Sequence, residues 1–384
     1  MTTTDPMVQD GPPEQSPPPA RRSHRLRRLI ALLVVVVVLA SGYLVASHYT
    51  SDLYALAPGS ATPVASAISV APPATTYRHN GEILFVTVSL RSVEPLGFVF
   101  DKLNPNVEVV NQKQLVGTAK ASQLNQVDAV QMQTSTQTAV IVALRRLGYT
   151  VDVQNLGALV QEVSAKSPAD GHLVPGDVIT EINGTPTTTN EALVNAIHSH
   201  QPGDVVKLTV QPPSGPARTE SIVLGKFPPV PAGQGTTPNY GFVGIVTGTK
   251  QRAVLPVNAT IDPGNVGGPS AGLAFTLGLI DALSGGDLTG GKKVAVTGTI
   301  GPDGEVGPVG GVPQKTVAVN RSRAVAFLVP PEEYEDAVKK AGPRVQVIKV
   351  STLDEALNAL ASLGGDVHAI PPAAPSTATT APAA

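Results

Sequence analysis

The chain has 384 residues, with 27 Lys and Arg against 29 Asp and Glu, so its formal net charge is −2. This balance excludes a nucleic-acid binder that depends on a large positive field. A sequence without cysteine excludes disulfides, thiolate nucleophiles and Cys-ligated zinc. The 37 glycines and 36 prolines make up about a fifth of the chain, against roughly an eighth in average proteins. We therefore expect turn-rich domains joined by unstructured segments.

The N-terminus predicts a membrane anchor. Five arginines close a disordered-looking cytoplasmic tail at residues 1–28, and residues 29–46 are uncharged and apolar. As a helix with ~1.5 Å rise per residue, this run is about 27 Å long, enough to cross a bilayer core once. The arginines stay in the cytoplasm by the positive-inside rule, which leaves residues 47–384 outside the cell membrane. The alternative is a cleaved signal peptide, because Ala55-Leu56-Ala57 matches the A-x-A pattern.

Composition and hydrophobic periodicity divide the rest of the chain. A strand rich in β-branched and aromatic residues at Glu82–Leu90 and a helix at Thr134–Leu147 define a first folded region. A helix at Asn190–Ile197 belongs to a second. The expected order is a stalk (47–77), an N-terminal α/β region (78–148), a β-rich domain (149–226), a proline-rich linker (227–239), a domain of alternating strands and helices (240–365) and a disordered tail (366–384). The predicted class is a multidomain α/β (α+β) protein.

The segment Asn265–Gly272 (NVGGPSAG) contains the candidate catalytic residue Ser270. An apolar helix follows, so Ser270 lies at a helix N-terminus, where free backbone N–H groups and the helix dipole stabilise an anion. Ser270 is therefore either a helix cap or an acyl-transfer nucleophile. The pattern G-x-S-x-G also fits the nucleophile elbow of α/β hydrolases, but that elbow needs a downstream histidine, and His368 lies in the predicted tail.

Two further patterns concern cofactors. Gly286–Lys292 matches the start of a phosphate-binding loop, but residue 293 is Lys where the loop needs Ser or Thr for Mg²⁺. We therefore predict no nucleotide, no metal and no other cofactor.

A serine can instead be activated by a lysine. A lysine acts as a general base when burial lowers its pKa from ~10.4 towards neutrality. Lys315 is the candidate, because it follows a glycine-rich run, Gly301–Gly311, whose backbone can approach the Ser270 turn closely. A surface lysine is the alternative interpretation of Lys315.

Residues 149–226 resemble a PDZ domain of the kind attached to bacterial proteases. The resemblance rests on Ser167–Pro186 (SPADGHLVPGDVITEINGTP). It implies a groove for an extended peptide between the strand at Leu159–Val163 and the helix at Asn190–Ile197. Asn155, Leu156, Gly157 and Leu159 are the implied peptide-binding residues, although the loop departs from the usual Gly-Leu-Gly-Phe type. A spacer domain without a ligand is the alternative.

Residues 240–365 resemble the proteolytic domain of Lon in three ordered motifs. These motifs are Gly268–Gly272 (GPSAG), Val296–Ile300 (VTGTI) and Pro308–Lys315 (PVGGVPQK). The resemblance implies Ser270 as nucleophile, Lys315 as its base and Thr297 as the residue that hydrogen-bonds the lysine. The backbone near Ala271 is expected to hold the oxyanion. Gly267 stands where Lon has an aspartate.

The combined resemblance is to membrane-anchored, PDZ-containing Lon-like serine proteases without an ATPase module. It implies an ATP-independent endopeptidase that cleaves unfolded or exposed polypeptides and assembles as a homo-oligomeric ring, with a hexamer as the expected form. A catalytically silent, membrane-tethered peptide-binding adaptor is the main alternative. An esterase that depends on His368 is a second.

Overall fold

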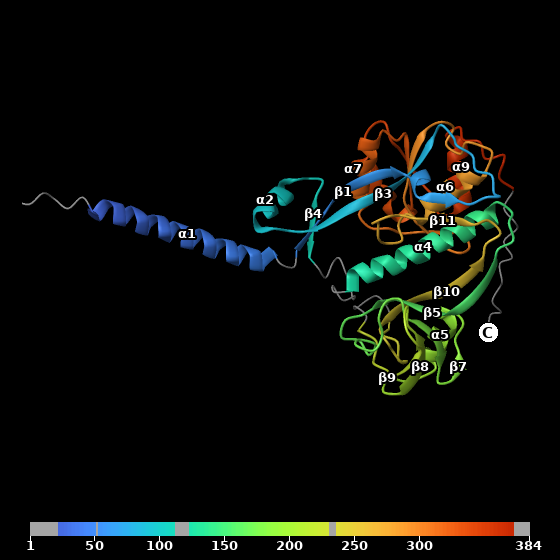
Figure 1. Ribbon diagram of the computed structural model, residues 1–384, viewed down its shortest axis with the longest axis horizontal. Helices are drawn as coiled ribbons and strands as arrows, with labels where there is room; N and C mark the ends of the chain where they lie inside the picture. The colour runs from blue at the N-terminus through green and yellow to red at the C-terminus, as the bar shows by residue number, and fades with distance from the viewer. Residues whose placement is uncertain (1–21, 51–52, 112–122, 230–235, 372–384) are drawn as a thin grey trace, which may run out of the picture.

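The computed structural model describes residues 22–50, 53–111, 123–229 and 236–371. Figure 1 shows two folded units, with helix α1 (Arg22–Thr50) projecting away from them. One unit is an α/β domain around a six-stranded sheet, and the other is a smaller β-rich domain with its own sheet. The predicted mixed α/β class with an apolar N-terminal helix is confirmed. The predicted tails at 1–21 and 372–384 lie outside the described residues.

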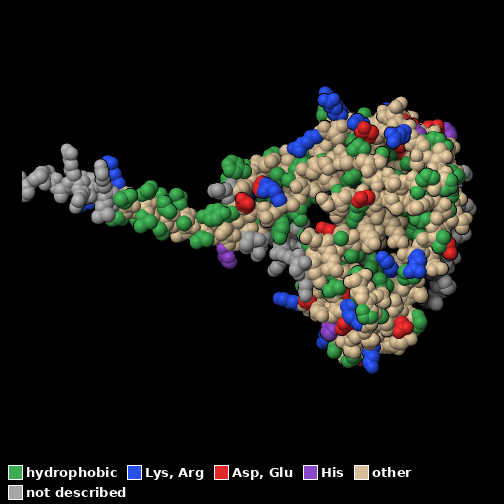
Figure 2. All heavy atoms as spheres, viewed as in Figure 1, with side chains coloured by type: hydrophobic (Ala, Val, Ile, Leu, Met, Phe, Trp, Pro, Cys, Tyr) green, Lys and Arg blue, Asp and Glu red, His purple; other side chains and the backbone are tan. Residues whose placement is uncertain are grey.

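Helix α1 begins within the segment that we predicted as a disordered tail, at Arg22 instead of residue 29. Between Arg27 and Val45 its mean hydropathy is 2.5, and none of this window is buried in the folded units. Figure 2 shows hydrophobic side chains along the helix and basic side chains at its outer end. By length and composition, α1 is able to cross a membrane.

The sheet of the larger domain has the strand order β16-β15-β12-β3-β1-β4. β3, β12, β15 and β16 are parallel neighbours, while β1 is antiparallel to β3 and to β4. The strands are β1 (Leu53–Pro63), β3 (Glu82–Ser92), β4 (Glu108–Asn111), β12 (Lys293–Val296), β15 (Ala326–Val329) and β16 (Gln346–Lys349).

Helices cover both faces of this sheet because its central strands are apolar on both sides. Phe85 and Leu328 pack on one face with α4 (Leu124–Arg146), α6 (Gly272–Leu283) and α9 (Leu353–Ser362). Leu84 and Phe327 pack on the other face with α7 (Val312–Ser322) and α8 (Tyr334–Lys340). The remaining elements are η1 (Val64–Ser66), β2 (Ile68–Val70), α2 (Pro95–Leu103), β11 (Ala259–Ile261), β13 (Thr299–Ile300), β14 (Val306–Gly307) and η3 (Pro331–Glu333).

The predicted stalk at 47–77 differs from the structure. β1 pairs with β3 from Tyr54 to Pro63, and β2 pairs with β11. β3 in turn pairs with β12, so the predicted N-terminal region at 78–148 shares its sheet with the C-terminal domain. The sequence did not predict β1, because its many Ala, Pro and Ser residues are typical of linkers. A long-range partner supplies the hydrogen bonds that make the segment a strand.

The smaller domain is inserted between α4 and β11. Its sheet has the order β10-β5-β6-β8-β9, with β7 paired to β6, and one helix, α5, covers it. These elements are β5 (Asp152–Val163), β6 (Val178–Ile182), β7 (Thr185–Pro186), α5 (Asn190–His198), β8 (Val205–Gln211), β9 (Arg218–Val223) and β10 (Ile245–Val254). The predicted boundary at residue 240 was wrong, since β10 pairs with β5 of the insert. The described parts of the predicted linker, residues 227–229 and 236–239, therefore belong to the insert. Phe227 makes an edge-to-face contact with Tyr240 and a tilted contact with Phe242.

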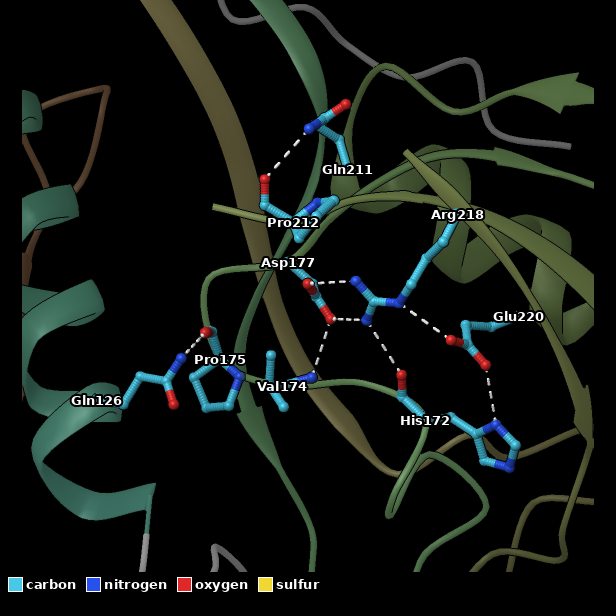
Figure 3. Close-up of polar contacts among 9 residues, drawn as sticks. All are labelled: Gln126, His172, Val174, Pro175, Asp177, Gln211, Pro212, Arg218 and Glu220. Atoms are coloured by element: carbon cyan, nitrogen blue, oxygen red, sulfur yellow. Dashed lines mark hydrogen bonds and ion pairs between the residues drawn. The ribbon is translucent and has the colours of Figure 1, made fainter. Parts of the chain in front are cut away.

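A buried ion pair fixes the turn at Pro175–Asp177 in the PDZ-like segment. Asp177 is fully buried, and Arg218 on β9 donates to both of its carboxylate oxygens, at 2.7 and 3.2 Å (Figure 3). Val174 N–H also donates to Asp177 at 3.0 Å. These charge-assisted hydrogen bonds offset the free-energy cost of removing the Asp177 carboxylate from water. The turn also contacts α4, because Gln126 donates to the Pro175 carbonyl at 2.6 Å.

Candidate active site

Ser270 lies on the turn that leads into α6. Gly268 has a φ of +79°, a conformation that favours glycine, and Ala271, just before the helix, makes no side-chain capping hydrogen bond. α6 begins here because the residues that follow are apolar and pack in the core, and every residue from Gly272 to Ile280 is buried. Ser270 itself is only half-buried. The core thus holds the helix rigidly while the serine remains accessible at its first turn.

The helix N-terminus leaves two backbone donors available. Gly272 N–H donates to Pro269 at 3.2 Å, and Leu273 N–H donates to Gly298 at 3.1 Å. Within the described part of the chain, the N–H groups of Ser270 and Ala271 have no hydrogen-bond acceptor. Unpaired N–H groups at a helix N-terminus are suited to an oxyanion.

Lys315 lies in the first turns of α7, an element that the sequence did not predict. Gly311 takes the left-handed conformation, with a φ of +69°, and turns the chain into the helix. The Lys315 side chain is only 2% exposed. Burial lowers its pKa from 10.5 to about 8, while the negative charge of Glu333 acts in the opposite direction. The interpretation of Lys315 as a surface lysine is therefore wrong.

Thr297 joins these two segments. Its hydroxyl accepts a hydrogen bond from Lys315 Nζ at 3.0 Å and donates one to the Ser270 carbonyl at 3.1 Å. Thr297 is fully buried at the end of β12, and its own N–H donates to Leu328 at 3.0 Å. Three residues from distant parts of the chain thus form one continuous hydrogen-bonded group. The Ser270 hydroxyl has no hydrogen-bond partner among the described residues.

Family models match the chain in two places. Residues 145–212 match the PDZ domain, and residues 257–362 match the Lon protease (S16) C-terminal proteolytic domain. The chain combines a PDZ domain with a Lon-type proteolytic domain. Both predicted resemblances are confirmed. In the structure, the Lon-type domain also includes β1 and β3, and the PDZ domain is inserted into it.

Individual relatives match over shorter stretches. Over 78 residues the chain is 44% identical to the serine protease PepD of Mycobacterium tuberculosis. This match covers 20% of the present chain and 17% of PepD. The Lon protease of Chloroflexus aggregans is 37% identical over 92 residues, which is 23% of this chain and 11% of that protein. The Lon protease of Vibrio parahaemolyticus is 37% identical over 93 residues, which is 23% of this chain and 12% of that protein. The chain therefore spans less than a fifth of the length of these curated relatives.

α4 lies directly on the serine turn of the Lon-type domain. Ser135 donates to the Pro269 carbonyl at 3.1 Å, and Gly268 N–H donates to the Asp128 carbonyl at 3.2 Å. A Cβ at Gly267 would lie 2.7 Å from the Cβ of Asp128, so glycine is required there for this close packing. Burial raises the pKa of the Asp128 carboxyl. Sequence reasoning missed these residues, because no motif links α4 to the serine segment.

The peptide groove predicted in the PDZ domain is filled by the chain itself. β10 is antiparallel to β5 along the whole strand, from Ile245 opposite Val163 to Val254 opposite Asp152. Asn190, at the start of α5, donates its N–H to the Thr249 hydroxyl at 3.1 Å. β10 thus lies along β5 and contacts α5, the two elements that were predicted to hold a peptide.

The predicted peptide-binding residues consequently pair with β10. Leu159 lies opposite Gly248, and Gly157 lies opposite Lys250. Asn155 accepts a hydrogen bond from Gln251 at 3.1 Å, whereas Leu156 lines a groove that faces α4. The prediction that these residues form an open strand edge for a peptide was therefore wrong, because β10 already pairs with that edge of β5.

Proposed function

We propose that the protein is a membrane-anchored, ATP-independent serine endopeptidase in which Ser270 is the nucleophile and Lys315 is its general base. The observation that carries this proposal is the hydrogen-bonded group of Lys315, Thr297 and Ser270 inside a Lon-type domain. The substrates are unfolded or exposed polypeptides, since hydrolysis requires an extended chain at Ser270.

The direction of the hydrogen bonds suits this chemistry. The Thr297 hydroxyl hydrogen is used by the Ser270 carbonyl, so Thr297 accepts a hydrogen from Lys315. A neutral amine that donates in this way keeps its lone pair free for the serine proton. With a pKa of about 8, about a tenth of Lys315 is neutral at pH 7 and about half at pH 8, against far less than 1% at pH 7 for an ordinary lysine.

The proposed reaction has two halves. Lys315 takes the Ser270 hydroxyl proton while Oγ attacks the peptide carbonyl, and the N–H groups of Ser270 and Ala271 bind the oxyanion. Lys315 then protonates the leaving amine, and the C–N bond breaks to give the acyl-enzyme. In the second half, Lys315 takes a proton from water, hydroxide adds to the ester, and the proton returns to Ser270 as the product acid leaves.

α1 is the proposed anchor, with the N-terminus in the cytoplasm and the folded domains outside. The competing signal-peptide model requires cleavage after Ala57, in the middle of β1. Ala55 is fully buried and pairs with Arg91 on β3. Such a cut would remove half of a sheet strand, which favours the retained anchor.

ATP independence is supported by the loop that resembles a phosphate-binding site. The N–H groups of Thr289 and Gly291 both donate to the Asp287 carboxylate at 3.0 Å. These N–H groups already donate to a carboxylate of the protein, so they are not available to bind a phosphate. A homo-oligomeric ring, with a hexamer as the expected form, remains part of the proposal from the family resemblance.

The PDZ domain has a regulatory role in this proposal. A peptide can add to β5 only when β10 leaves, and β10 is connected to the serine turn through α4. Gln137 on α4 donates to the Gln251 carbonyl of β10 at 2.8 Å, and Ser135 on the same helix holds Pro269. Exchange of β10 for a peptide would thus remove one of the contacts that hold α4 over Ser270.

The test uses the full chain in detergent, incubated with a reduced, unfolded protein and analysed by mass spectrometry after nucleotide removal by apyrase. Cleavage should disappear in Ser270→Ala and in Lys315→Ala. Ser221→Ala and Lys207→Ala, exposed residues on the PDZ sheet, are matched controls and should cleave normally. Full cleavage by Lys315→Ala would exclude the base, and an inactive wild type would favour the adaptor.

A further inference from the structure

Helix α2 carries an exposed apolar surface. Phe100 and Leu103 are 75% and 76% exposed, more than any other large hydrophobic side chain that the structure describes, and Val99 is 58% exposed. Residues three and four positions apart share one face of a helix, so these three side chains form a single apolar surface. Figure 2 shows hydrophobic side chains at the end of the folded units that faces α1.

The polarity of α2 is reversed relative to a surface helix of a soluble protein. Asp101, on the opposite side from the apolar surface, is only 5% exposed and pairs with Arg91 on β3. A helix whose outer side is in contact with water normally buries apolar residues and exposes charged ones. A concentrated apolar surface of this kind marks contact with a partner or with a membrane.

α2 lies beside the end of α1 (Figure 1). Every residue of α1 from 27 to 45 is exposed, whereas Thr50 is buried, so it is the last turns of α1 that contact the folded units. The apolar window of α1 ends at Val45, and Thr50 lies five residues, or about 7–8 Å, beyond it. The polar interface on each side of a bilayer core is about 5–8 Å thick, so α2 lies at the depth of this interface.

The connection between α1 and the sheet keeps α2 near the membrane. Two residues separate α1 from β1, so the Cα atoms of Thr50 and Leu53 are at most about 11 Å apart. The Leu53 carbonyl accepts a hydrogen bond from Val93 N–H at 3.0 Å, and α2 begins two residues later, at Pro95. α2 is therefore attached to the same end of the sheet that α1 enters.

We infer that α2 inserts its apolar surface, Val99, Phe100 and Leu103, into the outer interface of the membrane that α1 crosses. This inference rests on the proposed membrane anchor and adds a second contact with the lipid. An amphipathic helix in such a position buries its apolar side chains about 5–10 Å deep, at the boundary between headgroups and acyl chains. The exposed Lys102 extends its amine from the same helix towards the lipid phosphates.

A bilayer fits this surface better than a second copy of the chain does. The contact with α1 and the short connection to β1 place the surface at the end of the domain that lipid already surrounds. Two contacts, α1 and α2, also define how the Lon-type sheet is oriented on the membrane, because a single helix leaves the domain able to tilt. Thr297 lies at the end of β12 in this sheet, so the orientation of the candidate site follows from it.

The test uses depth-dependent quenching by lipid. The chain has no cysteine, so the full-length protein with Phe100→Cys can be labelled specifically with the fluorophore NBD. It is reconstituted into phosphatidylcholine vesicles, with or without a lipid that carries a nitroxide near the top of its acyl chain. Leu44→Cys, in the apolar window of α1, is the reference for the anchor, and Thr219→Cys, exposed on β9, is the control outside the membrane.

We expect the nitroxide to quench the label at residue 100 at least half as strongly as the label at residue 44, and to leave the label at residue 219 unchanged. Leu103→Asp should reduce the quenching at residue 100 about fivefold, because lipid disfavours a charged side chain at this depth. Val223→Asp, at an exposed apolar position of β9, is the matched control and should leave the quenching unchanged.

Quenching at residue 44 without quenching at residue 100 would overturn the inference, as would quenching at residue 100 that survives Leu103→Asp. A label at residue 100 that is shielded from water but not quenched by lipid would also overturn it, and would indicate contact with a second copy. Absent quenching at residue 44 would reject the membrane anchor and the inference with it. Vesicles that show the expected quenching but do not hydrolyse an unfolded protein would contradict the peptidase alone.

Discussion

Lys315 Nζ lies 3.0 Å from Thr297 Oγ1, and both residues are buried between α7 and the end of β12. This contact holds the amine at one end of a group whose other end is the Ser270 carbonyl. Because Thr297 bonds both partners through one oxygen, it determines where the lysine lies relative to the serine turn. It acts as a positioning residue for the proposed reaction.

Thr297→Val should lower kcat about 10–100-fold with little change in KM. The substitution keeps the shape but removes one accepted and one donated hydrogen bond, each with a typical effect of about 0.5–1.5 kcal/mol. Thr297→Ser retains the hydroxyl and should recover most of the activity. Peptide hydrolysis under steady-state conditions checks this, and equal losses in both variants would contradict the role of the hydroxyl.

Activity should depend on the neutral form of Lys315. Its pKa is about 8, so kcat/KM should rise about tenfold per pH unit below pH 8 and level off above it. A profile of kcat/KM from pH 6 to 10 checks this expectation. A flat profile, or a midpoint near pH 6, would show that another group is the base.

The same shift makes stability depend on pH. The folded-state pKa of Lys315 is lowered, so between pH 8 and 10.5 the unfolded chain binds the extra proton. The free energy of unfolding should therefore rise with pH across this window, by up to about 3 kcal/mol relative to Lys315→Met. Urea denaturation of both proteins at several pH values measures the difference, and a constant difference from pH 7 to 11 would argue against a buried amine.

Gly267→Ala should weaken the packing of α4 on the serine turn. The new Cβ would lie 2.7 Å from the Cβ of Asp128, and overpacking of this kind costs about 1–3 kcal/mol. Gly285→Ala is the control, because Gly285 lies in an exposed loop and the nearest atoms to its added Cβ, those of Tyr77, are 4.0 Å away. Thermal unfolding and peptide hydrolysis should both respond to the first variant only. Equal behaviour of the two variants would mean that α4 does not lie against the turn.

Thr249→Val should loosen β10. Thr249 accepts a hydrogen bond from Asn190 N–H and donates one to the Asn190 side chain at 3.3 Å. Amide hydrogen exchange should become faster in residues 245–254 but stay unchanged in β8, and the affinity for extended peptides should increase. Thr219→Val, an exposed position on β9, is the control. Unchanged exchange in β10 would contradict its role as a displaceable strand.

The sequence by itself predicted the two domain types, the apolar N-terminal helix and the three segments that meet at the site. Motifs made this possible, because GPSAG and VTGTI are local patterns whose residues also carry the contacts. The hydrogen bond between Thr297 and Lys315, which the resemblance implied, is present in the structure. The catalytic roles of Ser270 and Lys315 remain predictions until the variants are measured.

Only the tertiary structure decided how the domains are arranged. The segment 53–63 has the composition of a linker, yet the β3 edge makes it a sheet strand. β10 carries no signal for the PDZ sheet, and the unpaired edge of β5 is what recruits it. The burial of Lys315 and the position of α4 over Gly267 depend on packing between residues far apart in the chain. Local patterns specify turns and motifs, whereas strand partners and buried charges are set by contacts that no local pattern contains.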